Sequence, residues 1–550
     1  MIRRVIEYLK EHRMLVIASL LFFIIRLFYL DHAYLLRGER DIVLTGYFLA
    51  ENGKDLYGNF MPKEFYNIDM PTPFLSFYYS ALWWILLPFK TTFFARLPYV
   101  IATTTYIFLV YEIVRQITKN KLLSVLTALV FSFSPGIYHL SRLALEVNIA
   151  TPLLFAGILL YLKKQRWYAF LFFILSYFSY NGFKPLILPL ILYLEFYFLL
   201  KGESTKQFIK NSVIGIIFFI GLIVLSFGFI DGGLTLSRKA DLVFLSYDDI
   251  DPLVIYRRNS AIGPELFKQV FNNKITATVY YIIDVFIQGQ DLRYLFFKGD
   301  PAAIYATTFT GLFFLWMLPM YYLGFFHLAR NLKKEYLYIL GFILVGLIPS
   351  LINIDYISFT IRSILSTLGY AYIIAAGMVF FWKLISGLKM YLKVGIIGVF
   401  VAIFAVEMAY FTYNYFYRRP VTMFEMFFES EKDVAQYLLD DQKDYYIYDD
   451  SPRNILATYY FLKPKLNVAE AQVQLKKGFP YKFDGNVMRG CPVTGEKIRV
   501  EKGVIVAESC LDKDVYETLA RDEKIETIKY EDFSFKKAYF IFNSYIPKSQ

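Results

Sequence analysis

The apolar sequence MLVIASLLFFIIRLFYL, residues 14–30, is followed closely by the charged sequence LRGERDIV, residues 36–43. The apolar run is long enough to cross a hydrocarbon core of roughly 30 Å as a helix. The charged run then places two acids, Glu39 and Asp41, and the guanidinium of Arg40 just beyond the end of that helix. Carboxylates in this position are either solvated loop charges or the reactive groups of an enzyme that works at a membrane surface.

The composition of the whole chain favours lipid as the solvent for much of it. Of the 550 residues, 57% are hydrophobic and 20% are aromatic, and the mean hydropathy is +0.42. Soluble proteins are roughly 45–50% apolar. Further apolar runs lie at residues 212–230 and 394–410. We therefore expect a mainly α-helical, polytopic transmembrane bundle in the plasma membrane.

The distribution of basic residues predicts the topology. The net charge is +11, and placing the basic connectors in the cytoplasm explains it through the positive-inside rule, without a nucleic-acid partner. These connectors are residues 115–121, 163–166, 201–210, 330–334 and 389–393. The spans expected from about eleven crossings are 14–30, 95–117, 122–138, 149–162, 167–180, 184–200, 211–230, 305–328, 335–351, 361–382 and 393–412. The N-terminus is then cytoplasmic.

Two connectors are too long to be simple turns. Residues 31–94 form a first external loop, in which the apolar segment 73–89 lies along the membrane interface or re-enters the membrane. A missed hairpin partner for this segment is the alternative and raises the number of spans to about thirteen. Residues 231–304 form a second external loop, which we expect to be partly helical.

The sequence becomes polar after the last apolar run. We expect residues 1–417 to form the transmembrane catalytic domain and residues 418–550 a small extracytoplasmic α/β domain. Its strand candidates are residues 445–448, 504–507 and 538–542. Cys491 and Cys510 form a disulfide if this region is outside the cell, and are free thiols if it is inside.

The two acids of the opening stretch have three possible roles. Either carboxylate can act as a general base that deprotonates an acceptor. Either can instead bind a divalent cation that steadies a phosphate leaving group. The third possibility is an ordinary solvated loop. Asp69 is a further acid of the same external loop and a candidate substrate contact.

Four charged residues of three later segments fall on the same side of the predicted topology. Arg142 and Glu146 share a face if they lie on one helix, where they can form an ion pair. In the alternative, Arg142 lies near the phosphate and Glu146 is a second acid beside the first loop. Lys184 and Arg362 each open a span, where a cation is poorly placed for the helix dipole. A lipid-linked phosphate explains both positions, and so does snorkelling to headgroups.

Other motifs that signal chemistry are weak or missing from the sequence. The acids at residues 248–251 lack the ligand spacing of a calcium loop and are expected to be solvated. The four histidines show no zinc spacing, and there is neither a Walker motif nor a G-x-S-x-G elbow. The spacing therefore predicts no metal ligands, and a divalent cation at the first-loop acids is left as an alternative.

The order of several short motifs is similar to that of a known superfamily. They are Gly38-Glu-Arg-Asp41, Pro71-Thr-Pro-Phe-Leu-Ser-Phe-Tyr-Tyr79, Ala95-Arg-Leu-Pro98, Ser141-Arg142 with Glu146, and Phe297-Lys-Gly-Asp-Pro301. Over most of residues 1–420 the chain resembles the polytopic GT-C glycosyltransferases, in the branch of protein O-mannosyltransferases and aminoarabinose transferases.

The resemblance implies inverting transfer of a sugar from a polyprenyl-phosphate donor to a protein, lipid or polysaccharide. A first-loop carboxylate, Asp41 or Glu39, is then the essential acid, Glu146 is the second acid, and Lys184 and Arg362 meet the carrier phosphate. The main alternative is a transporter or flippase of lipid-linked saccharides, which needs ionisable residues deep within spans. Glu195 and Glu407 are the clearest acids of that kind. A non-catalytic scaffold for residues 418–550 is the third possibility.

Overall fold

The computed structural model describes residues 12–62, 64–67, 70–87, 89–229, 247–307, 309–331, 333–354, 357–441, 443–477, 479–491, 503–510, 526–528 and 539–542. The chain divides into two compact units. We call the first the helical unit; it comprises Met1–Phe28, Pro71–Pro73 and Tyr99–Tyr415. The second, the sheet unit, comprises Tyr29–Met70, Phe74–Pro98 and Phe416–Gln550.

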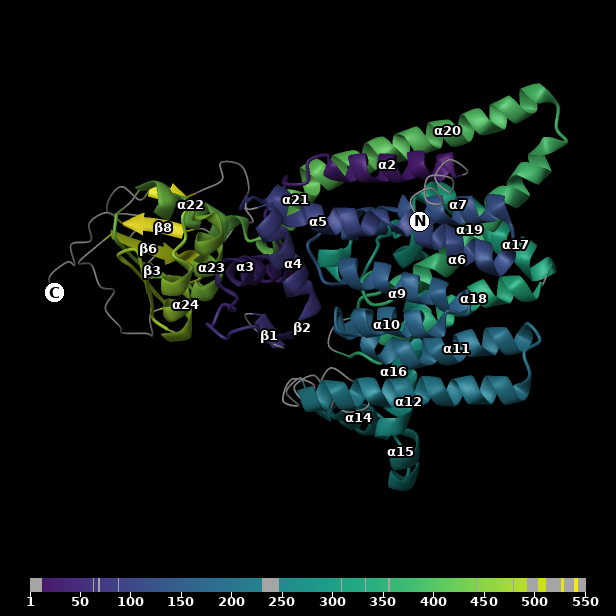
Figure 1. Ribbon diagram of the computed structural model, residues 1–550, viewed down its shortest axis with the longest axis horizontal. Helices are drawn as coiled ribbons and strands as arrows, with labels where there is room; N and C mark the ends of the chain where they lie inside the picture. The colour runs from purple at the N-terminus through teal and green to yellow at the C-terminus, as the bar shows by residue number, and fades with distance from the viewer. Residues whose placement is uncertain are drawn as a thin grey trace. The chain divides into compact units, whose positions relative to one another are not determined.

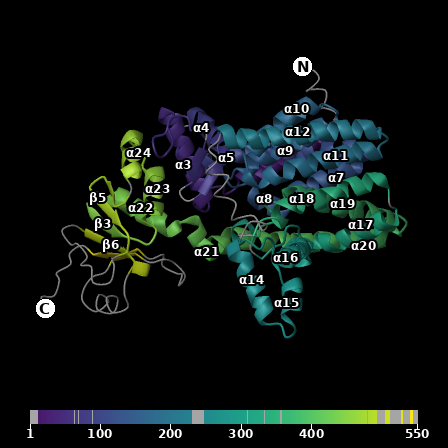
Figure 2. The same ribbon diagram turned by 90° about the horizontal axis from the view of Figure 1, so that it is seen from below.

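The helical unit contains a helix at each expected span. These helices are α2 (Arg13–Leu27), α5 (Thr92–Thr104) continued by α6 (Tyr106–Thr118), α7 (Lys121–Ser132), α9 (Val147–Leu162), α10 (Arg166–Tyr177), α11 (Ile187–Leu200), α12 (Thr205–Phe229), α17 (Leu318–Arg330), α18 (Lys334–Leu351), α19 (Ile364–Ser386) and α20 (Met390–Tyr413). Within the unit α9, α10, α11 and α12 run side by side (Figures 1 and 2). The prediction of a polytopic helical bundle is confirmed.

Six helical segments among the described residues are long and apolar enough to cross a membrane, judged by length and composition alone. They are Thr92–Thr118, Asn181–Leu200, Thr205–Ser226, Lys334–Leu351, Ile364–Ser386 and Met390–Thr422. Several other apolar helices, such as α7 and α9, are shorter. A helix shorter than the hydrocarbon core crosses it only with help from flanking residues or a thinner bilayer.

One expected span begins later than the hydropathy indicates. The segment predicted at 305–328 is α-helical only from Leu318, after a short 3-10 turn at Leu315–Met317. Pro319 lies in the first turn of α17, where proline fits without losing a hydrogen bond. Before it, Gly311 lies directly against the backbone of Phe296. Leu312 and Phe313 then donate backbone hydrogen bonds to residues 294 and 295, at 3.0 and 2.8 Å. This pairing of backbones takes the place of the first helical turns.

The described part of the second long connector is largely helical, as expected. It contains α14 (Tyr247–Asn259), α15 (Glu265–Phe271) and α16 (Lys274–Gly289). A small apolar cluster joins α14 to α16 through Ile250, Val254 and Ala277. The three helices therefore form a folded projection of the helical unit, visible in Figure 2.

The sheet unit combines the first connector with the polar C-terminal region. From the first connector come α3 (Arg37–Asn52), β1 (Glu64–Asn67), β2 (Met70–Pro73) and α4 (Leu75–Leu86), with β2 divided between the two units. The segment expected to lie at the interface, 73–89, is thus a short helix. It packs closely on α3, because Gly46 of α3 contacts Ser80 and the Trp84 indole donates to the Val43 carbonyl at 2.9 Å.

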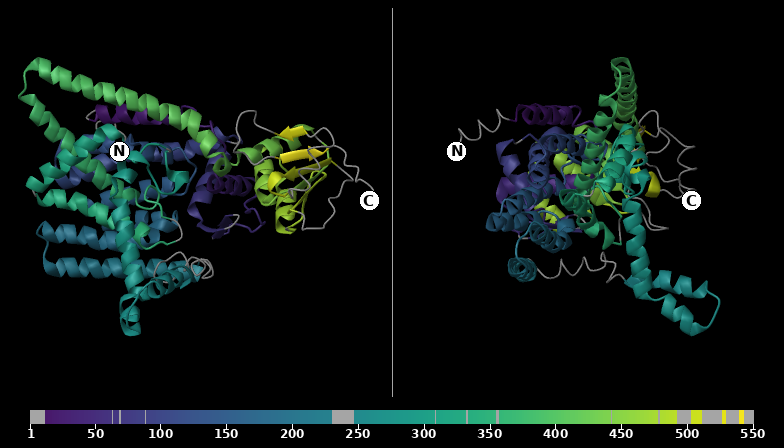
Figure 3. Two further views of the ribbon diagram at one scale, coloured as in Figure 1. Left: turned by 180° about the vertical axis from the view of Figure 1, so that it is seen from behind. Right: turned by 90° about the vertical axis from the view of Figure 1, so that its right-hand side faces the viewer.

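The C-terminal part of the sheet unit has a six-stranded sheet in the order β4-β5-β3-β6-β8-β7. The strands are β3 (Tyr445–Tyr448), β4 (Tyr481–Phe483), β5 (Asn486–Arg489), β6 (Gly503–Ala507), β7 (Glu526–Ile528) and β8 (Tyr539–Phe542). Central β3 runs parallel to β5 and β6, and the helices are α22 (Glu429–Asp441), α23 (Pro452–Leu462) and α24 (Val468–Lys477) (Figure 3). The predicted α/β domain is confirmed, and Cys491 is disulfide-bonded to Cys510.

The packing of α17 on α19 depends on two glycines. A Cβ atom at Gly377 would meet the Met320 carbonyl, and one at Gly324 would meet the Ile373 carbonyl. We expect Gly377→Ala to destabilise the protein by about 1–3 kcal/mol, the usual cost of overpacking, measured by thermal unfolding in detergent.

The matched control is Gly398→Ala in α20, where a Cβ has no neighbour within 4 Å. Because alanine is the better helix former by roughly 0.8–1.0 kcal/mol, this variant should be neutral or slightly stabilised. Equal effects of the two substitutions would contradict the close approach of α17 and α19.

Candidate active site

Residues 36–43 begin a buried helix, so the solvated-loop reading of this stretch is wrong. The Leu36 N–H donates to Glu39 Oε2 at 2.9 Å, as an N-terminal capping carboxylate does. A negative charge in the first turn also suits the helix dipole. Glu39, Arg40 and Asp41 are all buried. Helix α3 ends at Gly53, whose φ of +71° is the left-handed conformation that closes many helices.

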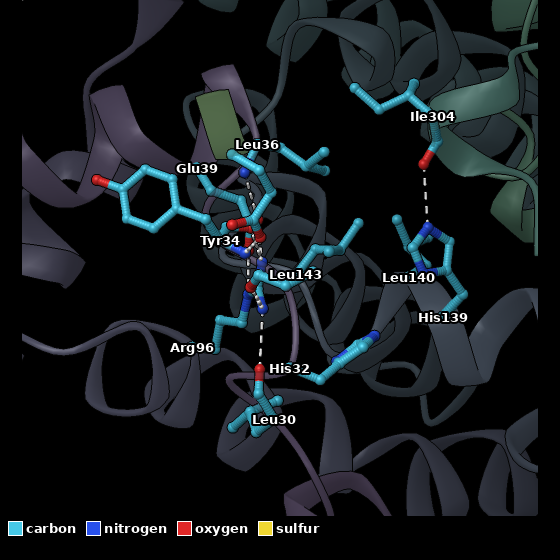
Figure 4. Close-up of polar contacts among 12 residues, drawn as sticks. Leu30, His32, Tyr34, Leu36, Glu39, Arg96, His139, Leu140, Leu143 and Ile304 are labelled. Carbon is cyan, nitrogen blue, oxygen red and sulfur yellow. Dashed lines mark hydrogen bonds and ion pairs between the residues drawn. The ribbon is translucent and has the colours of Figure 1, made fainter. Parts of the chain in front are cut away.

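Arg96 of α5 forms an ion pair with Glu39 and hydrogen-bonds to backbone carbonyls of the segment before α3. Its Nε and Nη2 atoms each lie 2.8 Å from a carboxylate oxygen of Glu39. Nη1 donates to the carbonyls of Leu30 and Ala33 at 2.8 and 2.9 Å, and Nη2 donates to that of Tyr34 at 2.9 Å (Figure 4). Guanidinium and carboxylate are 2% and 0% exposed. A buried ion pair with this many satisfied donors fixes the relative positions of the segments that it joins.

Asp41 has a different environment, two residues further along α3. Its Oδ1 accepts from Arg40 Nε and Nη2 at 3.2 and 3.1 Å. Arg40 also donates to the carbonyl and side-chain oxygens of Asn454, at 3.1 and 3.0 Å, and lies 4.6 Å above the Phe428 ring. Burial lowers the pKa of the Arg453 guanidinium, and Tyr481 and Asp41 act in the opposite direction. Asp41 is therefore a buried acid beside arginines.

Arg142 of the helical unit is a buried residue at a break between helices. Helix α8 (Pro135–Leu140) ends before it, and α9 begins at Val147. The expected shared helical face of Arg142 and Glu146 is therefore wrong. Arg142 Nη1 donates to the carbonyls of Arg26 and Phe28 at 3.0 and 2.7 Å, and to the hydroxyl of Tyr138 at 2.8 Å.

The two cations expected at span starts are both half-buried. Lys184 lies in the short 3-10 helix η1 (Asn181–Leu186), with its ammonium 5.6 Å from the Tyr177 ring centre. Arg362 lies in the turn immediately before α19. Arg142, Glu146, Lys184 and Arg362 all belong to the helical unit, and Glu39, Arg40 and Asp41 to the sheet unit.

Asp300 holds the turn that carries Arg362, a role that the sequence analysis missed. Its Oδ2 accepts from the Ser358 hydroxyl at 3.0 Å and from the N–H groups of Phe359 and Thr360 at 2.9 and 2.6 Å. Its Oδ1 accepts from Ala302 at 2.8 Å. The only signal in the sequence was its place in the Phe297–Pro301 motif, where the acid follows Gly299, a residue with φ of +75°.

Two further predictions concern Asp69, a candidate substrate contact, and the acids at residues 248–251, which are expected to be solvated. Asp69 lies outside the described residues. Asp251, from the stretch expected to be solvated, forms an exposed ion pair with Lys274 at 2.9 Å. Among the residues that the structure describes, no group of three or more histidine, cysteine or acidic side chains is arranged to hold a metal ion.

These sites define a helical membrane protein with a buried, arginine-paired carboxylate in its sheet unit. Solved structures with a similar fold are the archaeal oligosaccharyltransferase AglB from Archaeoglobus fulgidus, in complex with an inhibitory peptide and a dolichol-phosphate, and ArnT from Cupriavidus metallidurans.

The similarities are modest. The match to AglB has a TM-score of 0.41 at 14% identity and covers 82% of this chain. This chain covers 64% of AglB, less than two thirds of its length. The apo form of ArnT matches with a TM-score of 0.38 at 10% identity, over 96% of this chain and 97% of ArnT. The form bound to undecaprenyl phosphate matches with 0.41 at 9%, over 97% and 98%. No protein-family model and no curated protein sequence matches this chain.

The contacts of Glu39 predict that it stabilises the fold. Glu39→Gln removes the charge that faces the buried Arg96 guanidinium, and breaking one side of a buried pair costs about 3–5 kcal/mol. We expect a large drop in the thermal unfolding midpoint of the purified protein. The control is Glu51→Gln, the same substitution at an exposed position of α3, which should leave the midpoint unchanged. Equal midpoints for the two variants would contradict the structural role.

The buried carboxyl of Asp300 should make the stability of the protein depend on pH. Burial raises the pKa of its carboxyl above the usual 3.8, against the opposing effect of its hydrogen-bond donors. An acid with a raised pKa in the folded state contributes stability below its unfolded pKa and loses that contribution as the pH rises through the folded value. As the pH rises above about 4, the wild type should lose stability relative to Asp300→Asn. Thermal unfolding at several pH values measures this, and a pH-independent difference would contradict it.

Proposed function

We propose that this protein is a membrane glycosyltransferase that transfers a sugar from a polyprenyl-phosphate donor to an acceptor on the extracytoplasmic face, with inversion and with Asp41 as the general base. The observation that carries the proposal is the different use of two neighbouring acids in α3. Glu39 is committed to Arg96 and to the helix start, whereas Asp41 is paired with Arg40 of the same turn. The motif order described above supports the same class.

The proposed reaction uses the Asp41 carboxylate to accept a proton. The acceptor hydroxyl or amine attacks the anomeric carbon as its proton passes to Asp41, and the bond from that carbon to the phosphate oxygen breaks. The electrons of this bond leave with the polyprenyl phosphate. A positioned base of this kind contributes roughly 10²–10⁴-fold to a rate.

The phosphate that leaves needs positive charge around it. We assign this role to Lys184 and Arg362, since arginine binds phosphate through two parallel hydrogen bonds, with Arg142 and Glu146 as further contacts of the substrate. Asp300 supports the assignment of Arg362 because it holds residues 358–360 through three hydrogen bonds. A divalent cation can share the task, and activity in the presence of a chelator tests that.

The contacts of two intramembrane acids count against the transporter alternative. Glu195 accepts hydrogen bonds from Tyr161, Arg166 and Asn211 at 2.6, 2.9 and 3.0 Å. Glu407 accepts from the N–H groups of Leu315 and Trp316 at the start of the segment that leads into α17. Both acids thus connect helices of the bundle, whereas a transport pathway needs ionisable groups that exchange partners.

The decisive variant is Asp41→Asn, which keeps the size of the side chain and removes its capacity to accept a proton. We expect transfer from a labelled polyprenyl-phosphate sugar to fall by about 10²–10⁴-fold, in purified protein reconstituted into lipid nanodiscs. Asp31→Asn, at an exposed acid before α3, is the matched control and should keep full activity.

Thermal unfolding of each variant shows whether a loss of turnover reflects a loss of folding. Full transfer by folded Asp41→Asn would overturn the assignment of the base. A folded Glu39→Gln protein without transfer would assign the base to Glu39 instead.

A further inference from the structure

The projection formed by α14, α15 and α16 exposes an unusual amount of apolar surface. In α15, Leu266, Phe267, Val270 and Phe271 are between 53% and 70% exposed. In α16, the exposed side chains are Ile275, Val279, Tyr280, Ile283 and Ile287, at 48–76%. We call these nine side chains the apolar face. Soluble surfaces rarely expose large contiguous apolar patches unless the patch binds something.

Each of the two helices is amphipathic, so the apolar face has a definite orientation. At 100° per residue, the four apolar residues of α15 share one side, and Glu265, Lys268, Gln269 and Asn272 share the other. In α16 the apolar stripe lies opposite Ala277 and Val285, which are buried. Its polar edge is formed by Asp284 and Gln288, which hydrogen-bond to each other at 2.8 Å. This is the pattern of helices that lie in a membrane interface.

The attachment of α16 to the bundle sets the level of the apolar face. Gly289, at the end of α16, contacts Leu347 in the last turns of the candidate span α18. Tyr281 donates to the carbonyl of Asn353, just beyond α18, at 2.6 Å, and Tyr370 of α19 donates to that of Gly289 at 2.9 Å. The projection therefore joins the bundle at the end of the candidate span α18, which is where we expect the membrane boundary.

From this point the projection extends away from the bundle. Figures 2 and 3 show α14 and α15 projecting away from the bundle helices, across the direction in which α11 and α18 run. Basic and aromatic side chains accompany them: Arg257 lies 5.2 Å from the ring centre of Tyr280, and Arg258 donates to the Asn272 carbonyl at 2.7 Å. Arginine and tyrosine are typical of the level of lipid headgroups.

We propose that the apolar face of α15 and α16 is inserted into the lipid of one membrane leaflet, so that this connector is an interfacial anchor of the bundle. The occupant of the face is the bilayer itself, because the face begins at the end of the candidate span α18 and the projection extends across the direction of the spans (Figure 2). The apolar cluster of α14 and α16 around Ile250 and Val254 holds the projection in this orientation.

The chain is well suited to a direct test by fluorescence quenching. Its two cysteines are bonded to each other, so one introduced cysteine gives one labelling site. Phe271→Cys and Ile283→Cys place a bimane label on the apolar face, and Gln269→Cys places it on the opposite side of α15. Val399→Cys, exposed on the candidate span around α20, is the reference for lipid.

The full-length protein is reconstituted into nanodiscs of phosphatidylcholine and phosphatidylglycerol. We expect brominated lipid to quench labels at 271 and 283 to the same extent as at 399, and aqueous iodide to quench them little. The label at 269 should show the reverse.

Strong iodide quenching with little lipid quenching at both 271 and 283 would overturn the proposal. So would protection from both quenchers with cross-linking between copies, because the face would then be an interface between two chains. Unfolding midpoints equal to that of the unsubstituted protein show that the labelled variants are folded.

Discussion

The ion pair between Arg96 and Glu39 is the contact on which the arrangement around Asp41 depends. Both groups are removed from water, which is costly unless their hydrogen bonds are satisfied. Here Arg96 makes two bonds to the carboxylate and three to backbone carbonyls. Its guanidinium thus fastens the turn after the first apolar run to the first turn of α3. Because Asp41 lies in that same turn, its position is determined by this clamp.

Glu39 and Asp41 lie two residues apart in α3, and their different surroundings give them different roles. Glu39 faces a guanidinium from a distant helix and its own helix start, so its loss should appear as lost stability. Asp41 faces its neighbour Arg40, which has further partners in Asn454 and Phe428. The proposed base is thus the acid that pairs with a residue of its own helix, whereas Glu39 pairs with a residue of another helix. In the helical unit, Asp300 resembles Glu39, since its oxygens hold backbone N–H groups and a hydroxyl.

Much of the fold follows from simple patterns in the sequence. Apolar lengths and the positions of basic connectors predict the spans from α2 to α20, and short apolar runs in the polar C-terminal region predict β3, β6 and β8. The late start of α17 was not predicted, because the backbone pairing of residues 311–313 with residues 294–296 competes with helix formation and leaves no trace in hydropathy. The break at residues 141–146 falls in the connector expected between the spans 122–138 and 149–162.

The site was predictable only in part. The sequence indicates that Glu39 and Asp41 follow a span, but not that Glu39 pairs with a residue 57 positions away. An arginine among apolar residues, as in Ala95-Arg96-Leu-Pro98, is the signal that identifies such a partner, because a buried guanidinium needs an acid or several carbonyls. Asp300 gives an equally faint signal, since its partners at 358–360 are distant in sequence and uncharged.

The central claim, that Asp41 serves a sugar transfer from a lipid phosphate, is tested most directly by analysis of the products. The purified protein in nanodiscs is incubated with a polyprenyl-phosphate sugar and with protein, lipid and polysaccharide acceptors, and mass spectrometry and NMR follow both products. We expect equal amounts of free polyprenyl phosphate and of glycosylated acceptor, with the anomeric configuration inverted. Movement of intact donor across a bilayer without release of polyprenyl phosphate would contradict it.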